Sequence, residues 1–221
     1  MIRKRMVRKM LEKMKKIRLL LITSLVCMLP SVYGLLKWNE LPDKLPTHWN
    51  AQGVVDGWSS KEFAVFGLPL MLVGFNLIGF IALSVDPKGQ NQGKKMKALA
   101  MWIFPVVSIF ACTASLNGGL GIEGNMSYYA LLFLGIILVL IGNYLPKCKQ
   151  NYTVGIKVPW TLDSEANWNK THRFAGFLWI IAGIVMITAT LLECYMVVIP
   201  CAIVAGIVPI VYSFVLYKKG V

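Results

Sequence analysis

The sequence predicts an all-α integral membrane protein with six transmembrane helices. Of its 221 residues, 57% are apolar and only 15% are charged, and the mean hydropathy is +0.62. Soluble domains usually carry about 25% charged residues, so this chain has too few to cover a water-facing surface. A helix needs roughly 20 apolar residues to cross a hydrocarbon core of about 30 Å. Six runs come close to this length: 17–36, 63–85, 98–120, 128–146, 174–193 and 195–217.

The division between the last two runs depends on a short connection. The two runs meet at Glu193, Cys194 and Tyr195, and the combined stretch is far too long for a single crossing. We therefore expect a tight reversal of the chain near Glu193.

The basic residues predict the orientation of these helices. Nine of the 23 Lys and Arg residues lie within 1–18, and the others alternate between successive loops. Twenty fall on one predicted side of the membrane and three on the other. The positive-inside rule places the larger set, and with it both termini, in the cytoplasm.

The tail, residues 1–16, has a pattern of its own. Ile2, Met6, Met10 and Met14 recur every four residues, and Lys and Arg fill most other positions. This spacing predicts a basic amphipathic cytoplasmic helix on the anionic lipids of the inner leaflet, or a segment that only fixes the topology. Although the net charge is +13, the charges gather at the ends of apolar runs, so direct nucleic-acid binding is not expected.

The outer loop after the first helix carries residues that contact with lipid does not explain. Pro42 restricts the backbone, and Asp56-Gly57 is a turn signal, so the loop is expected to be compact and ordered. Two interpretations stay open: a structural lid with interfacial tryptophans, and a surface that recognises a toxin or other ligand outside the cell. The candidate ligand-binding residues are Pro46, His48, Trp49, Asn50, Gly53, Asp56, Gly57 and Trp58.

The inner loop, residues 147–173, is the second such stretch. Asp163 is a suitable N-cap for an amphipathic helix that precedes the fifth span and continues into it. Trp160, Trp168 and His172 are expected to lie together near the inner interface. The loop is either an interfacial connector or a partner-binding or gating surface. The candidate residues are Gly155, Lys157, Pro159, Trp160, Thr161, Glu165, Trp168, Thr171, His172 and Arg173.

No catalytic, metal or cofactor site is expected. The two histidines, His48 and His172, are predicted on opposite sides of the membrane, and His48 with Asp56 does not make a coordination sphere. The five cysteines are scattered without a metal-binding pattern. The glycines within 118–124 are interpreted as a flexible turn rather than a phosphate loop. A small-solute transporter and a non-catalytic assembly protein stay open, although the span centres hold only neutral polar groups such as Asn76.

The two loops resemble a known family. Leu41-Pro42, Pro46-Thr47-His48-Trp49-Asn50, Gly53 and Asp56-Gly57-Trp58 resemble the short domain of unknown function that begins many bacterial SdpI-like proteins. The inner stretch resembles the signature of that same family, through Gly155-Ile-Lys-Val-Pro-Trp-Thr-Leu162, Glu165, Trp168, Lys170-Thr171-His172-Arg173 and Gly176. The family usually has Arg and Thr where this chain has Lys157 and Val158.

The resemblance implies an immunity protein of the bacterial cell membrane. SdpI-like proteins protect the producing cell from a secreted peptide toxin, and some also hold a transcriptional repressor at the membrane. It implies a domain of unknown function at 17–90, behind the tail, and a four-helix SdpI-like region at 91–221. The outer loop would meet the toxin and the inner loop the repressor.

Overall fold

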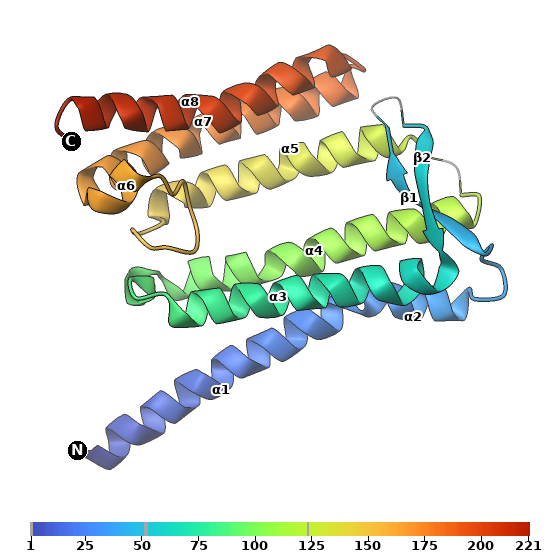
Figure 1. Ribbon diagram of the computed structural model, residues 1–221, viewed down its shortest axis with the longest axis horizontal. Helices are drawn as coiled ribbons and strands as arrows, with labels where there is room; N and C mark the ends of the chain where they lie inside the picture. The colour runs from blue at the N-terminus through green and yellow to red at the C-terminus, as the bar shows by residue number, and fades with distance from the viewer. Residues whose placement is uncertain (1, 51–52, 123) are drawn as a thin grey trace. The chain divides into compact units, whose positions relative to one another are not determined.

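The computed structural model describes residues 2–50, 53–122 and 124–221 (Figure 1). Within these residues, six helices are long and apolar enough to cross a membrane: Met10–Leu36, Phe63–Val85, Lys94–Gly119, Met126–Lys147, Glu165–Leu191 and Tyr195–Lys218. The predicted six-helix membrane fold is confirmed, and each predicted run overlaps one of these helices. The cytoplasmic position of the termini stays a prediction.

The chain forms two compact units. The first comprises residues 1–82 and 98–124, and the second comprises 83–97 and 125–221. The predicted domains at 1–16, 17–90 and 91–221 stay a prediction.

The first unit contains α1 (Ile2–Cys27), α2 (Leu29–Leu36) and most of α3 (Leu68–Val85) and α4 (Lys94–Gly119). α1 runs without a break from the basic tail into the first span, so the tail is helical. The described apolar side chains within residues 6–17 are exposed, as contact with lipid requires: Met6, Val7, Met10, Leu11, Met14 and Ile17. The side chain of Ile2 lies outside the described residues, and binding of the tail to anionic lipid stays a prediction.

Pro69 opens a gap in the backbone hydrogen bonds at the start of α3. Because proline has no amide hydrogen, the carbonyl of Val65, four residues earlier, loses its helical donor. The buried hydroxyl of Ser31 on α2 donates to this carbonyl over 2.7 Å. The π-helical turn η1 (Phe63–Gly67) marks the same place. The Ser31 bond therefore joins α2 to the start of α3, where lipid offers no replacement donor.

Pro30 interrupts the first span in a similar way. The amide of Ser31 bonds to the carbonyl of Met28 instead of that of Cys27, which would be its partner in an unbroken helix. The hydroxyl of Ser108, on α4, donates to the free Cys27 carbonyl over 2.7 Å. The interruption between α1 and α2 therefore supplies a hydrogen bond that holds α1 against α4.

The second unit is built on three long helices and several short ones. The long ones are α5 (Met126–Tyr144), α7 (Glu165–Leu191) and α8 (Val198–Lys218). The short ones are η2 (Gly89–Asn91), η3 (Leu145–Lys147), α6 (Pro159–Asp163) and η4 (Tyr195–Val197).

α5 and α7 pack with their backbones in contact through two pairs of glycines. A Cβ atom on Gly135 would lie 3.0 Å from the carbonyl oxygen of Gly183, and one on Gly142 would lie 2.8 Å from that of Gly176. The two pairs lie two turns apart on each helix, so they occupy one face. Small residues let membrane helices approach closely, and van der Waals contact then stabilises the pair.

α7 and α8 are joined by the tight reversal that the sequence predicts. Glu193 has a positive φ of 57°, and the amide of Cys194 donates back to the carbonyl of Ala189 over 2.7 Å. Further along, Pro209 removes the helical donor of the Ala205 carbonyl. The indole nitrogen of Trp179, on α7, donates to that carbonyl over 2.8 Å and holds the two helices together.

Replacing Gly183 by alanine is expected to lower the free energy of unfolding by about 1–3 kcal/mol, as overpacking typically does. The new methyl group would lie 2.6 Å from the carbonyl oxygen of Gly135. Gly206→Ala is the matched control, because a Cβ atom there meets nothing within 4 Å. Unfolding in increasing dodecyl sulfate, followed by tryptophan fluorescence, measures the difference. Equal stability of the two variants would show that the α5–α7 contact is looser than described.

Candidate functional site

The first candidate site is the hairpin loop, residues 37–62. It contains a two-stranded antiparallel sheet of β1 (Lys44–Trp49) and β2 (Val55–Ser60), which the all-α prediction did not include (Figure 1). Asn50 and Gly53 shape the turn: the Asn50 side chain accepts from the amide of Val54 over 3.0 Å, and Gly53 has a φ of 78°. These two predicted ligand-binding residues therefore have a local structural role.

The hairpin loop is seated on the last turn of α4. Leu45 and Pro46 of β1 are buried, and a Cβ atom on Gly118 would lie 2.7 Å from the Pro46 ring. A Cβ atom on Gly119 would lie 2.9 Å from Leu45. Gly118 and Gly119 therefore end a helix and receive the hairpin, so their interpretation as part of a flexible turn is wrong. Part of the expected turn, Glu123, lies outside the described residues.

The opposite face of the hairpin is exposed. The Nδ1 atom of His48 and a carboxylate oxygen of Asp56 form a hydrogen-bonded pair, with 71% and 45% of the side chains exposed. Such an exposed pair contributes little to stability, so it is available to a ligand. Trp58 is 58% exposed on the same strand as Asp56. Gly57 lies opposite His48, where a Cβ atom would be 2.7 Å from the His48 Cβ.

The predicted outer set therefore divides into two groups. His48, Asp56 and Trp58 form the exposed face, which we call the hairpin face. The others build or seat the hairpin: Pro46, Trp49, Asn50, Gly53 and Gly57. Among the described residues no group of three His, Cys, Asp or Glu side chains could hold a metal ion.

The second candidate site is the motif loop, residues 148–163, together with the first turns of α7. Its irregular backbone is folded around Asn151, which is fully buried. The Asn151 amide nitrogen donates to the carbonyls of Lys149 and Val154 over 2.8 and 2.9 Å. Its oxygen accepts from the amides of Thr153 and Val154 over 2.9 and 2.7 Å. One side chain thus replaces the bonds that a helix would supply.

Trp168 and His172 form the wall against which the motif loop lies. Their rings stack with centroids 4.0 Å apart, and both side chains are fully buried. The Trp168 indole nitrogen donates to the Cys148 carbonyl over 2.7 Å. The amide of Ile156 donates to Nε2 of His172 over 2.9 Å, so Nε2 is unprotonated. Nδ1 therefore carries the proton and donates to the Trp168 carbonyl over 2.8 Å.

The close approach of residue 155 to the Trp168 and His172 rings requires a glycine at this position. Its φ is 124°, and a Cβ atom there would overlap Nε2 of His172 and lie 2.9 Å from the Trp168 ring. L-residues with a side chain rarely adopt such a φ. Gly155 of the motif loop and Trp168 and His172 of α7 are therefore one packed group.

Thr161 closes the other half of the motif loop. Its buried hydroxyl donates to the Ile156 carbonyl over 2.8 Å and accepts from the Val158 amide over 3.1 Å. Pro159 begins α6, a position where a missing amide hydrogen costs nothing. The N-cap of α7 is Ser164, whose hydroxyl accepts from the Asn167 amide; Asp163 ends α6 instead, so its predicted role as the cap is wrong.

Trp160 has partners of its own on α8. Its indole nitrogen donates to the hydroxyl of Ser213 over 2.8 Å, and its ring packs against Phe214 and Tyr217. The sequence predicts Trp160 beside Trp168 and His172, whereas the structure stacks only those two on each other. Thr171 is buried and donates to the side chain of Asn167, which donates in turn to the Ser213 carbonyl.

The predicted inner set also divides into two groups. Gly155, Thr161, Trp168, Thr171 and His172 form the packed interior, and Trp160 fixes α6 to α8. The exposed members are Lys157, Pro159, Glu165 and Arg173, which we call the motif face. Sequence reasoning overlooked the residues that hold the loop from outside the motif: Asp86, Lys88, Gln92, Gln150, Asn167 and Ser213. Their common signal is a polar side chain beside or within an apolar span, which the sequence alone does not pair.

Comparisons with known proteins find two matched regions and one relative. Residues 147–213 match the SdpI/YfhL protein family, and residues 25–73 match a domain of unknown function, DUF1648. Immunity protein SdpI of Bacillus subtilis (strain 168) is 23% identical over 202 residues, which cover 90% of this chain and 96% of that protein. No solved structure matches the chain.

The six candidate membrane spans and the similarity to these proteins show that the chain is a multi-pass cell-membrane protein. The predicted resemblance to the SdpI-like proteins is confirmed, with the domain of unknown function first and the SdpI/YfhL region second. The relative is an immunity protein, so the family gives no support to an enzymatic function.

Gly155→Ala is expected to destabilise the second unit by about 1–3 kcal/mol, the usual cost of strained backbone. The methyl group would enter the space of the His172 ring. Gly93→Ala serves as the control, because a Cβ atom at Gly93 meets nothing within 4 Å. Thermal unfolding in detergent measures both variants. A Gly155→Ala protein with the same melting temperature as the wild type would contradict the described packing.

Proposed function

We propose that this chain is a membrane immunity protein that protects a bacterium from a secreted peptide toxin, with the hairpin face as the toxin-binding surface. The observation that carries the proposal is the similarity to immunity protein SdpI, which extends over nearly the whole of both chains. The hairpin face supports it further. Trp58 beside a His48–Asp56 pair combines an exposed aromatic ring with polar groups, as protein-binding surfaces commonly do.

The motif face is the proposed surface for a cytoplasmic partner, a transcriptional repressor held at the membrane. Lys157 and Arg173 supply exposed positive charge, and Glu165 supplies an exposed carboxylate. Because the packed interior fixes the backbone beneath these side chains, a partner would bind a surface that is already ordered. Both termini, and the tail on anionic lipid, belong to this same cytoplasmic side.

The alternatives lack a comparable observation. A small-solute transporter or a non-catalytic assembly protein has no arrangement within residues 2–50, 53–122 and 124–221 that favours it over immunity. Measured solute flux through the purified protein in liposomes would support the transporter instead.

Expression of the chain in a toxin-sensitive bacterium tests immunity directly. Cells are challenged with secreted peptide toxins from strains that carry SdpI-like proteins, and survivors are counted. Trp58→Ala is expected to lower survival about tenfold, because loss of an exposed aromatic anchor typically costs that much binding. Trp102→Ala is the matched control, a partly exposed tryptophan in the middle of a span. No protection by the wild type against any toxin would refute the proposal.

Co-purification tests the motif face. The double variant Lys157→Ala, Arg173→Ala is expected to lose a transcriptional repressor that co-purifies with the wild-type protein, because it removes both positive charges of this face. Lys149→Ala removes an exposed charge from the same loop outside the motif face and is expected to retain the repressor. Equal retention by both variants would show that the repressor binds elsewhere.

A further inference from the structure

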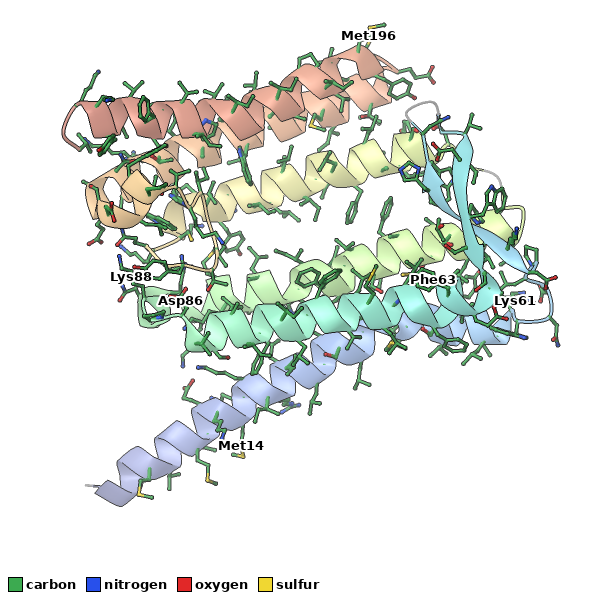
Figure 2. All side chains as sticks on the ribbon, in the orientation of Figure 1. Met14, Lys61, Phe63, Asp86, Lys88 and Met196 are labelled. Carbon is green, nitrogen blue, oxygen red and sulfur yellow. The ribbon has the colours of Figure 1, made fainter. Side chains whose placement is uncertain are left out.

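The connection between α3 and α4 holds the motif loop by side chains that neither family match includes. A carboxylate oxygen of Asp86 accepts from the Tyr152 amide over 3.0 Å and from the Thr153 hydroxyl over 2.8 Å. The ammonium group of Lys88 donates to the side-chain oxygen of Gln150 over 2.7 Å and to the Leu162 carbonyl over 3.2 Å. Figure 2 labels Asp86 and Lys88 on this connection.

Gln92 is the third member of this group. Its amide nitrogen donates to the Lys149 carbonyl over 3.0 Å and lies 3.1 Å from the Cys148 sulfur. Its own oxygen is buried and has no hydrogen-bond partner among the described residues. We call these three residues, Asp86, Lys88 and Gln92, the clamp. Their side chains hydrogen-bond to the motif loop at positions from 148 to 162. An unpartnered oxygen is unfavourable, so the closed clamp is not an optimal arrangement for Gln92.

The clamp leads directly into α4, whose far end carries the hairpin loop. Gln92 lies two residues before Lys94, where α4 begins. At the other end, Gly118 and Gly119 receive Pro46 and Leu45 of β1, and Asn117 accepts a hydrogen bond from the Tyr33 hydroxyl over 3.0 Å. α4 is one helix of 26 residues, about 39 Å long at 1.5 Å per residue.

We propose that α4 transmits a change in the hairpin loop to the motif loop, with the clamp as its receiving end. The inference rests on the proposed function, in which the hairpin face meets a ligand. A ligand alters a distant site only if the protein has two arrangements that the ligand binds differently. Movement of the hairpin on Gly118 and Gly119 would shift α4, and a shift of α4 carries Gln92 away from Lys149.

Pro105 gives α4 a place to bend. It lies inside the helix and has no amide hydrogen for the Met101 carbonyl, so one backbone bond is missing there. The half of α4 after Pro105 is held to α1 by the Ser108–Cys27 bond, about which a displacement at Gly118 and Gly119 would tilt the helix. The half before Pro105, which leads back to the clamp, is therefore the part that bending would displace.

Cys148 is a natural reporter of the clamp. Its thiol is 1% exposed, and burial raises its pKa, so it reacts slowly with maleimides while the loop is closed. The full-length protein is prepared with Cys194→Ser and Cys201→Ser, which removes the more accessible thiols. A small membrane-permeant maleimide is added to membrane vesicles and its incorporation is measured by mass. The same protein with Cys148→Ser gives the background from Cys27 and Cys112.

Gln92→Ala tests the receiving end and Gly118→Ala tests the transmission. Each is expected to raise the rate of Cys148 labelling about fivefold or more, the lower range of typical coupling between sites. Gly74→Ala is the matched control, a glycine of the first unit where a Cβ atom meets nothing within 4 Å, and it should label at the wild-type rate. Should Gly118→Ala fail to accumulate in the membrane, Leu45→Val, a milder change at the same contact, replaces it with the same expected result.

Two results would overturn the inference. If Gln92→Ala leaves labelling unchanged, the clamp does not hold the loop. If Gln92→Ala raises labelling but the hairpin variant does not, α4 does not transmit. The labelling needs no toxin, so its failure leaves the survival test untouched. If both variants label faster as expected but the wild-type protein gives no survival, immunity alone is refuted.

Discussion

Hydrogen bonding of the backbone inside lipid is the constraint on which this structure depends. Hydrocarbon supplies no water, so a carbonyl that proline deprives of its donor must find another within the protein. Ser31 serves the Val65 carbonyl, and Trp179 serves the Ala205 carbonyl. Each of these bonds connects two different helices. The prolines within the spans therefore do more than bend helices: they create the acceptors that fix helix pairing within each unit.

The motif loop satisfies the same requirement with no helix at all. Asn151, Thr161 and His172 supply the donors and acceptors for an irregular backbone beside the end of a span. Such backbone is tolerated at a membrane only when it is buried in protein. The motif that marks the family is thus mainly a set of residues that fold the loop. The exposed part of the motif is the smaller motif face.

Much of the fold could be predicted because the strongest signal in the sequence is the length of its apolar runs. A run near 20 residues has one economical conformation in lipid, so the six spans are confirmed. The hairpin could not be predicted from alternation, because Pro42, Pro46 and Gly57 resemble a turn-rich loop. Its strands pair with each other, and β1 is seated on Gly118 and Gly119, which lie about 70 residues further along the chain.

The candidate site was predictable where its residues are close in sequence and not elsewhere. The spacing of Trp168 and His172 placed them on one helix face, and they stack. Asp86 and Thr153, by contrast, are 67 residues apart, and nothing in either stretch indicates the other. The cap of α7 was misplaced by one residue, because Asp163 and Ser164 are both good caps and only the geometry of α6 decides between them.

Lys157 and Val158, which differ from the usual residues of the resembled motif, lie on the outward side of the motif loop. Lys157 is exposed and makes one hydrogen bond, to the Thr153 carbonyl, whereas an Arg would offer a planar fork of donors. Val158 precedes α6 at its N-cap, where a Thr hydroxyl would complete the capping box that Thr161 half supplies. Neither residue belongs to the packed group of Gly155, Trp168 and His172. The departures therefore change the outward side of the motif loop and leave its packed interior intact.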